Sequence, residues 1–528
     1  MRRLFHSIFP VNALPAAQLV SEGIDVLSHR ADVKLKAVEE YYCRLDADLL
    51  FCFSDIVIQA EAMGAEIAFT ADSMPSVKRT ATHLHAMRAG ETPRMRVNAE
   101  VIRGLARTYP DRPVAAMVYG PFTVAGQVAG EQRILRAVVE NPGEVHAILE
   151  KTLECAGDYA DLLLSAGGGV LWVSDPLASL LPPGLFREFA GEPLARLFRR
   201  HEVLSALHIC GDTSRIVLDM VNTGVNGISF DQCLDLTTVE DLLPETVAII
   251  GNVDPVEVLE LATKEDVAEA TADLVTVMGI LKNFCLSSGC APPPSTPLAN
   301  LISFVAAGRR ALAEICKFRS DLEDISTLVH SGRRQELGEK VKKVLGEDIE
   351  PMAILNSGLM RAIRKGSARY EAHFCHLPEI LLMVDAFNEG YRLIYPRLGI
   401  ADQSSIKIAL GTVQGDIHEI GKDLVKIVLE TIGTKVLDLG VNVEPERFLA
   451  AHLKEGIPII GLSAFNTSSR RQVKRVVELF MEHACEQAVI LTGGAAMNQQ
   501  IATELGCHGY ARDAVSAVRL VKGWLARK

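Results

Sequence analysis

The sequence lacks a long apolar run. Its longest uncharged stretch, Asn283 to Gly308, is broken by serines and four prolines, so it falls short of the roughly 18 consecutive apolar residues that a membrane-spanning helix needs. The beginning of the chain also lacks the continuous apolar core of a secretion signal, because His6 and Pro10 interrupt it. We therefore expect no membrane partner and no signal peptide.

Positive charge is scarce as well. The formal net charge is -12, whereas a protein that binds mainly nucleic acid needs a basic face to displace counterions. The few basic pairs, such as Arg333-Arg334 and Lys342-Lys343, lie in segments with a helical pattern, which predicts solvated helix faces. Nucleic acid is excluded as the main partner.

The cysteines show no disulfide framework. There are eleven of them, an odd number at irregular spacing, which indicates a reducing compartment with some thiols free for metal chemistry. We expect the cytoplasm. The chain of 528 residues, 48% of them apolar, is too long for one hydrophobic core, so two or three domains are expected.

Short β-rich runs alternate with helical patterns between about residues 110 and 290. This alternation predicts βα units on a parallel sheet. At least six such strands favour a (β/α)8 barrel, with an open doubly wound sheet as the alternative. The runs are Pro113–Tyr119, Gly169–Val173, Leu204–Ile209, Gly227–Phe230, Val247–Ile250 and Asn283–Leu286.

The rest of the chain is an α/β arrangement of a different kind. A charged stretch from Ser320 to about Leu398 has helical spacing and predicts a small bundle. Four buried-type strands with helical segments after them then predict a flavodoxin-like doubly wound sheet. The expected domains are residues 1–318, 319–400 and 401–528. The four strands are Ile406–Leu410, Lys435–Leu439, Ile459–Ser463 and Val489–Thr492.

A histidine motif follows the first of these four strands. The pattern Asp416-x-His418-x-x-Gly421 stands between the strand and the next helix, at the sheet edge where doubly wound folds bind ligands. One imidazole nitrogen can coordinate a metal there while Asp416 accepts the proton of the other. Taken alone, the motif fits an ordinary loop histidine beside an Asx turn better.

Four separate pieces place this motif in a wider pattern that resembles the cobalamin-binding domains of methyltransferases over residues 403–528. The pieces are Gly411-Thr412-Val413-x-Gly415-Asp416-x-His418-x-Ile420-Gly421-Lys422, Leu439-Gly440-Val441-x-Val443, Ser463-Ala464 and Gly493-Gly494-Ala495. The resemblance implies that His418 is the lower cobalt ligand of a corrinoid, in place of the corrinoid's own nucleotide base.

The same resemblance implies the surroundings of the corrinoid. Its displaced tail would pass Ser463 and the turn Gly493-Gly494, where glycine permits close approach to the backbone. Phe465 departs from the pattern, since relatives often carry a smaller aliphatic residue there. Residues 319–400 resemble the helical cap bundle that shields the upper face of the cofactor from competing reactions.

A second group of candidate ligands lies in the predicted barrel. His208 and Cys210 end one strand, and side chains two apart on a strand share a face. Cys290 follows another strand, and all strands of a parallel barrel end on one rim. One histidine and two cysteines form a zinc site with an open fourth position. A buried histidine with two inert thiols is the alternative.

Residues 35–310 resemble the uroporphyrinogen decarboxylase superfamily, in particular its zinc methyltransferase branch. The matching pieces are Glu61-Ala62-Met63-Gly64-Ala65-Glu66, Gly120-Pro121-Phe122-Thr123, Asp175-Pro176-x-Ala178-Ser179, His208-x-Cys210-Gly211, Gly251-Asn252-Val253-Asp254-Pro255, and Gly289-Cys290 with prolines after it. The resemblance implies that His208, Cys210 and Cys290 bind zinc. The arginine-rich motif of true decarboxylases is missing, so porphyrinogen decarboxylation is not expected.

The resemblance also suggests residues that line the pocket. Asp55, Glu61, Asp175, Asp231 and Asn252 lie near predicted strand ends or loops, where they could act as candidate catalytic residues or supply a fourth zinc ligand. Each of them can equally be a helix cap or a turn residue.

The order of the parts, barrel first and corrinoid domain second, resembles the chloromethane methyltransferase fusion proteins. It implies that a small methyl donor, a halomethane or another one-carbon compound, gives its methyl group to cobalt(I). A second methyltransferase would then pass the group to tetrahydrofolate or a thiol, and a reductive activation protein would maintain the corrinoid. Two alternatives remain: a zinc-activated thiol that accepts the methyl group of methylcobalamin, and a corrinoid carrier or sensor with an idle barrel.

Overall fold

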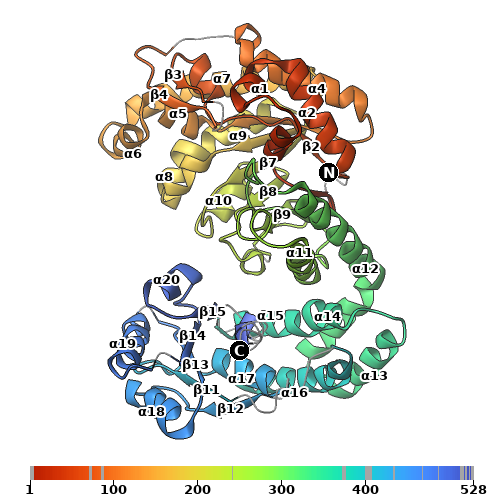
Figure 1. Cartoon of the computed structure of the whole chain (residues 1–528), viewed down its shortest axis with the longest axis vertical. Coiled ribbons are helices and arrows are strands. Elements are labelled where there is room, and N and C mark those ends of the chain that lie inside the picture. The colour runs from red at the N-terminus through yellow and green to blue at the C-terminus, as the bar shows by residue number, and fades with distance from the viewer. Residues whose placement is uncertain are drawn as a thin grey trace. The chain divides into compact units, whose positions relative to one another are not determined.

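The structure is a computed structural model that divides into two compact units, Met1–Arg319 and Ser320–Lys528 (Figure 1). It describes the whole chain except residues 1–4, 71–73, 85–88, 241, 372–375, 399–406, 432–433, 467, 486, 512–515, 518–519, 522–523 and 525–528. The expected three-domain boundaries stay a prediction.

The first unit contains eight parallel strands in the order β1-β10-β9-β8-β7-β6-β5-β2. This order confirms the predicted (β/α)8 barrel over the open sheet, because the strands follow one another around the rim. The strands are β1 (Ile8–Phe9), β2 (Leu50–Phe51), β5 (Val114–Tyr119), β6 (Val170–Ser174), β7 (Leu204–Ile209), β8 (Gly227–Phe230), β9 (Ala248–Val253) and β10 (Phe284–Ser288).

Helices follow the strands around the barrel, and a short hairpin stands apart from it (Figure 1). The hairpin consists of β3 (Glu66–Ala68) and β4 (Ser76–Arg79). The helices are α1 (Ile24–His29), α2 (Ala31–Arg44), α3 (Ile58–Ala62), α4 (Pro93–Thr108), α5 (Pro121–Ala129), α6 (Glu131–Glu140), α7 (Pro142–Ser165), α8 (Pro183–Phe186), α9 (Glu192–Arg200), α10 (Val217–Asn222), α11 (Lys264–Met278) and α12 (Leu298–His330).

Aromatic side chains fill the inside of the barrel. The Trp172 ring meets Phe51 edge to face at 5.1 Å and Phe9 at 6.1 Å, and all three side chains are fully buried. Edge-to-face contact is a favoured geometry for aromatic pairs. The barrel interior is therefore a packed core below the rim, as is usual for this fold.

Strands β1 and β2 stand at the two ends of the strand order, and Asp48 joins them. Its Oδ2 accepts a hydrogen bond from Ile8 N at 2.7 Å, and its backbone N–H donates to Ile8 O at 2.9 Å. Arg309 Nη2 donates to Asp48 Oδ1 at 2.8 Å. We call this connection the β1–β2 seam.

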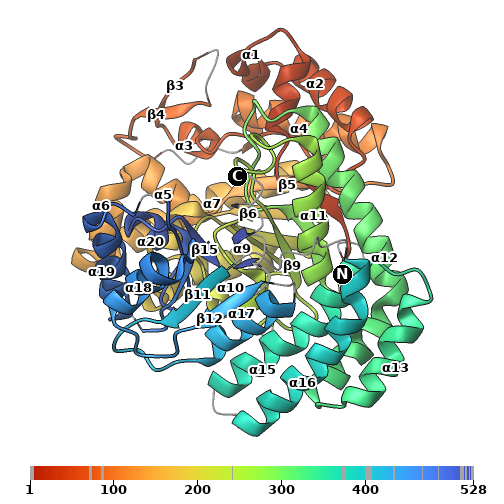
Figure 2. The same cartoon turned by 60° about the horizontal axis from the view of Figure 1, so that its bottom comes forward.

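The second unit begins with helices and ends with a parallel sheet. Among the helices, α15 (Arg361–Glu371) and α13 (Arg334–Leu345) pack against α16 (Leu377–Ile394), which lies alongside α15 in Figure 2. A short α14 (Pro351–Ala353) continues into a π-helical segment, Ile354–Met360.

The sheet has the strand order β12-β11-β13-β14-β15, the flavodoxin-like order 2-1-3-4-5, which confirms the predicted doubly wound fold. Its strands are β11 (Lys407–Thr412), β12 (Lys435–Asp438), β13 (Ile459–Ser463), β14 (Val489–Gly493) and β15 (Gly509–Ala511). Its helices are α17 (Ile420–Thr431), α18 (Pro445–Glu455), α19 (Ser469–Glu482) and α20 (Gln499–Glu504).

The strand register brings the ends of three strands together. Thr412 of β11 pairs with Ser463 of β13, which pairs with Gly493 of β14. Ser463 and Gly493, far apart in the sequence, therefore stand in one row at the carboxyl edge of the sheet. Among the helices that the structure describes, none is long and apolar enough to cross a membrane.

Candidate metal and corrinoid sites

Three ligand-type side chains meet at the carboxyl end of the barrel. His208 is the next-to-last residue of β7, Cys210 lies just beyond that strand, and Cys290 follows β10. The ligand atoms of all three lie within 4.8 Å of one another. Cys210 Sγ is 3.3 Å from His208 Nε2 and 3.8 Å from Cys290 Sγ. The imidazole is buried, whereas both thiols are half-buried.

These distances fit a single zinc ion. Zinc–sulfur bonds of about 2.3 Å in a tetrahedral arrangement separate two thiolates by about 3.8 Å, which is the separation of the two sulfur atoms here. Three protein ligands leave one tetrahedral position for a substrate atom.

Neighbouring polar groups orient these ligands. His208 Nδ1 lies 3.1 Å from Ser229 Oγ, so that Nε2 faces the thiols. Asp231 accepts hydrogen bonds from the backbone N–H groups of Gly211, at 2.9 Å, and Cys233, at 3.0 Å. Gly211 has a φ of 84°, in the region that favours glycine. Asp231 thereby fixes the backbone directly after Cys210.

The two thiols are electrostatically unequal. Hydrogen bonding to Cys210, helped by His208, lowers the pKa of Cys290, although burial opposes this shift. Hydrogen bonding to Cys290, together with burial, raises the pKa of Cys210. One thiolate is thus stabilised beside the buried imidazole, which is the state in which sulfur binds metals.

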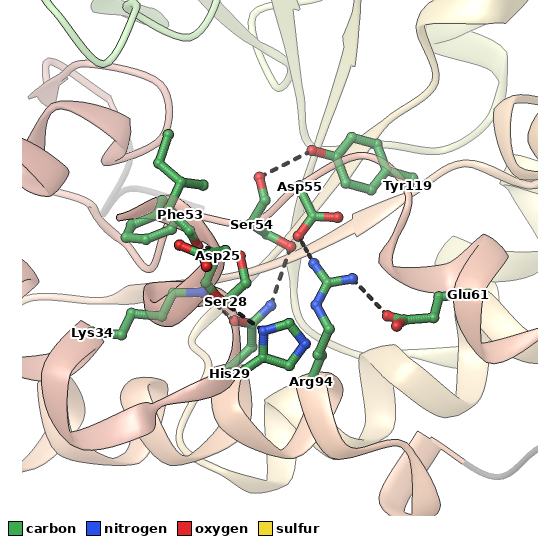
Figure 3. A network of polar contacts seen from close by, with 12 residues as sticks. Asp25, Ser28, His29, Lys34, Phe53, Ser54, Asp55, Glu61, Arg94 and Tyr119 are labelled. Carbon is green, nitrogen blue, oxygen red and sulfur yellow. Dashed lines mark hydrogen bonds and ion pairs between the residues drawn. The ribbon is translucent and has the colours of Figure 1, made fainter. Parts of the chain in front are cut away.

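Two of the candidate catalytic residues belong to an ion-paired group beside the barrel rim, and neither is in the thiol cluster. Figure 3 shows Arg94 between the carboxylates of Asp55 and Glu61. Its Nη1 donates to Glu61 Oε2 at 2.6 Å. Asp55 Oδ1 is buried and has no hydrogen-bond partner within the described part of the chain. Burial raises the pKa of Asp55 despite Arg94.

Tyr119, at the end of β5, is a site residue that the sequence analysis missed. The Gln59 side chain holds it by bonds to its backbone N–H, 2.6 Å, and C=O, 3.0 Å. Its hydroxyl donates a long 3.4 Å bond to Ser54 O (Figure 3). Burial raises the pKa of Tyr119 well above its ordinary value, and the nearby Asp55 raises it further. The phenol therefore stays protonated.

The other two candidates support the backbone near the rim. Asp175 Oδ1 accepts hydrogen bonds from Thr123 N at 2.7 Å and Thr123 Oγ1 at 2.6 Å, in the first turn of α5. Asn252 Nδ2 donates to Asp231 O at 2.9 Å and to Leu234 O at 2.6 Å. A catalytic role for either residue stays a prediction.

The histidine motif of the second unit has well-defined contacts. His418 Nδ1 lies 2.7 Å from Asp416 Oδ1, which also accepts a bond from the His418 backbone N–H at 3.1 Å. Thr412 Oγ1 donates to His418 O at 2.8 Å. Because Nδ1 is engaged, Nε2 is the nitrogen that can bind cobalt. The His418 side chain is 45% exposed, so this nitrogen is within reach of a ligand.

The second oxygen of Asp416 is also engaged. Asp416 Oδ2 accepts hydrogen bonds from Phe465 N at 2.7 Å, Asn466 N at 3.3 Å and Ser469 Oγ at 2.8 Å. Burial alone would raise the pKa of Asp416, but these bonds and the one from His418 lower it to about 2. Ser469 was missed by the sequence analysis, because its distance of 53 residues from Asp416 hides the contact.

The glycines near the sheet edge differ in their surroundings. A Cβ atom at Gly421 would meet nothing within 4 Å, so free space adjoins the histidine motif. Gly494 has a φ of 108°, and a Cβ there would stand 2.4 Å from Ala464 O. Ser463 and Gly493, at the same edge, are half-buried. An accessible imidazole next to free space fits a bound corrinoid.

Two family models match the chain. The uroporphyrinogen decarboxylase model matches residues 14–311, and the B12 binding domain model matches residues 406–519. A methylated-thiol–coenzyme M methyltransferase of Methanosarcina mazei is 26% identical over 295 residues, which are 54% of this chain and 78% of that protein.

Two further relatives are corrinoid proteins. A corrinoid protein of Desulfitobacterium hafniense is 30% identical over 211 residues, 39% of this chain and 98% of the relative. A dimethylamine corrinoid protein of Methanosarcina barkeri is 30% identical over 208 residues, which are 39% of this chain and 97% of that protein.

Among solved structures, a methyltransferase from Methanosarcina mazei has a TM-score of 0.53 at 22% identity, covering 58% of this chain and 93% of that one. This last likeness concerns the fold.

Proposed function

The chain belongs to the uroporphyrinogen decarboxylase family, joined to a B12 binding domain, and on this premise we propose that it is a corrinoid-dependent methyltransferase. The observation that carries the proposal is that one chain contains both a His-Cys-Cys cluster of zinc geometry and an Asp-His pair with an accessible imidazole. When bound, the corrinoid would supply a cobalt centre that takes up and gives away a methyl group.

The barrel site would bind the methyl donor through zinc. His208, Cys210 and Cys290 would hold the ion, which acts as a Lewis acid on the atom that leaves the methyl group. Ser229 keeps Nε2 of His208 directed at the metal position, and Asp231 keeps the segment after Cys210 in place. The hydroxyl of Tyr119 stays protonated in this part of the barrel and donates to Ser54 O.

The second unit would bind the corrinoid through His418. Nε2 of His418 would be the cobalt ligand, while Asp416 accepts the Nδ1 proton and Ser469 in turn binds Asp416. The carboxylate raises the basicity of the imidazole and fixes its tautomer. Ser463 and Gly493 would line the path of the nucleotide tail, because they lie beside Thr412 in one row at the carboxyl edge of the sheet.

We propose a small one-carbon compound, such as a halomethane, as the methyl donor. A second methyltransferase that uses tetrahydrofolate or a thiol, and a reductive activation protein, would complete the system.

A second candidate runs the transfer in the opposite direction, with a thiol at zinc as the acceptor. Two thiolates lower the net charge of zinc, which favours activation of a bound nucleophile over strong Lewis acidity. The similarity to a methylated-thiol–coenzyme M methyltransferase supports a sulfur compound at this site.

Substrate trials with the full chain test the proposal. The protein is reconstituted with cobalamin, reduced to cobalt(I) and offered halomethanes, methanethiol, methylamines and methoxyaromatics, while the absorption spectrum is followed. The methylated cofactor should form with one donor class, and Cys290→Ser should abolish its formation. Demethylation by an added thiol would instead support the second candidate. Failure of every donor and every thiol would leave a corrinoid carrier or sensor.

A further inference from the structure

The ring of Phe465 lies flat against the imidazole of His418. The two ring centroids are 4.0 Å apart, and the ring planes differ by 22°. Phe465 is half-buried and stands two residues beyond the end of β13. The stacked pair therefore joins the loop after β13 to the loop after β11, on which His418 lies.

Asp416 and Thr412 hold the backbone of His418, but these backbone bonds do not set the rotation of its ring. His418 lies in an irregular segment between β11 and α17. The Asp416 carboxylate holds one edge of the ring at Nδ1, which leaves the ring free to rock about that hydrogen bond. A flat partner against the ring face restricts this remaining motion, and Phe465 is in that position.

Phe465 is itself anchored to the same carboxylate. Its N–H donates to Asp416 Oδ2 at 2.7 Å. The preceding residue, Ala464, is fully buried and donates from its backbone N–H to Gly493 O at 2.9 Å. Asp416 thus binds the His418 ring through Oδ1 and the backbone of Phe465 through Oδ2. This shared carboxylate keeps the two rings in a fixed relative position.

We propose that Phe465 is a positioning residue that pre-orders the His418 ring for cobalt binding. The inference rests on the proposed corrinoid function and on Nε2 of His418 as the cobalt ligand. A ring that is already ordered loses less conformational freedom when it binds the metal. Phe465 thereby strengthens the bond to cobalt(II) without touching cobalt itself.

The strength of this bond can be read from the cobalt(II)/cobalt(I) reduction potential. Cobalt(I) carries no axial ligand, so His418 stabilises only the oxidised state of this couple and lowers its potential. Each tenfold change in ligand binding then shifts a one-electron potential by about 59 mV. Aromatic pairs contribute enough to predict a roughly two- to tenfold weaker bond without the phenyl ring.

The experiment uses the full chain loaded with hydroxocobalamin and titrated by spectroelectrochemistry. Phe465→Leu should raise the midpoint potential by about 18 to 59 mV, the equivalent of the two- to tenfold change. Phe465→Tyr keeps a stacking ring and should retain the wild-type potential. Cofactor content is measured for each variant by absorbance, and the potential refers to the loaded fraction.

A double-mutant cycle separates positioning from a direct effect on the corrin ring. In a His418→Ala background, Phe465→Leu should shift the potential little, because no imidazole remains to be ordered. An equal shift in both backgrounds would overturn the proposal, as would an unchanged potential in Phe465→Leu alone.

Electron resonance of the wild-type cobalt(II) form distinguishes this inference from the proposed function. Nitrogen coupling in the wild type, with no effect of Phe465→Leu on the potential, would refute only the role of Phe465. Absence of nitrogen coupling in the wild type would refute His418 as the cobalt ligand and the positioning role together.

Discussion

At the scale of single residues, Asp416 shows how one side chain can organise a site. Its two oxygens accept bonds from both the backbone and the ring of His418, and from the loop after β13. The carboxylate is fully buried, yet its pKa is lowered to about 2, because these donors outweigh the effect of burial. Its charge is therefore present at any physiological pH.

Ser469→Ala should weaken this arrangement in a pH-dependent way. A hydrogen bond to a charged group contributes about 1.5 to 3 kcal/mol, so we expect a loss of about that size in the free energy of unfolding at pH 7. The lowered pKa of Asp416 means that its stabilisation is present above the unfolded value near 4 and is lost as the pH falls toward 2.

Urea denaturation of the variant and the wild type checks this expectation. The difference in the free energy of unfolding should shrink as the pH falls from about 4 toward 2. A difference that is constant with pH would mean that the serine hydroxyl does not act through the Asp416 charge.

The residues that sequence reasoning identified differ in kind from those it missed. His208, Cys210 and Cys290 could be predicted to share a rim, because strand periodicity and barrel topology bring them there. Ser229 and Arg94 could not, since a serine in a strand and an arginine in a helix are ordinary residues in the sequence. Their roles come from contacts between distant segments.

At the scale of secondary structure, the α5 helix depends on a side chain from the next βα unit. Asp175 follows β6 and accepts both hydrogen-bonding groups of Thr123 in the first turn of α5. Sequence reasoning placed Asp175 in the pocket because it follows a predicted strand. Its Oδ1 binds the first turn of the helix, and a role for Asp175 in the pocket stays a prediction.

Asp175→Ala should destabilise the protein by about 1 to 2 kcal/mol through loss of this cap, whereas Asp175→Asn keeps an acceptor oxygen and should cost less. Burial raises the pKa of Asp175 to about 6. Its contribution is therefore most favourable below the unfolded pKa near 4 and declines as the pH rises through 6.

Thermal unfolding at pH 4.5 and 7 measures both effects. The Asn variant cannot ionise, so its stability relative to the wild type should improve at the higher pH. The same relative stability at both values would contradict a raised carboxyl pKa.

Short strands account for what the sequence could not predict at this scale. The longer strands β5 to β10 carry buried runs that alternate with helical patterns, and these were recognised. By contrast, β1 and β2 have two residues each, too few for any periodicity. Their strand character arises from pairing with β10 and β5, which are remote or separated in the sequence.

At the scale of the whole molecule, the two candidate sites draw their ligands from separate units. The thiol cluster lies in Met1–Arg319 and the Asp-His pair in Ser320–Lys528. The ligand sets share no residue, so changes in one should leave binding at the other intact. The proposed methyl transfer, in contrast, would need both.

We therefore expect two variants to affect different bound groups, one the zinc and the other the corrinoid. Cys290→Ser should lose most of its zinc while it retains corrinoid, and His418→Ala should retain zinc while its cobalt loses the histidine ligand. Cys233→Ser is a matched control. The Cys233 thiol is exposed and follows β8 at the same end of the barrel, but it is not one of the three clustered ligands.

Metal analysis and corrinoid absorbance of the purified full-length variants provide the measurement. Undiminished zinc in Cys290→Ser, or an equal loss in Cys233→Ser, would count against the proposed zinc site. Loss of corrinoid from Cys290→Ser would show that the two sites depend on each other.

The β1–β2 seam affects where the barrel opens transiently. Elsewhere a ladder of backbone bonds joins neighbouring strands, but here the side chain and the backbone N–H of Asp48 make the connection, and Arg309 fixes the Asp48 side chain. Both side chains are partly exposed, so dissolved ions screen their attraction. Transient opening, and with it the exchange of buried amide hydrogens, should begin at this seam and become faster as ionic strength rises.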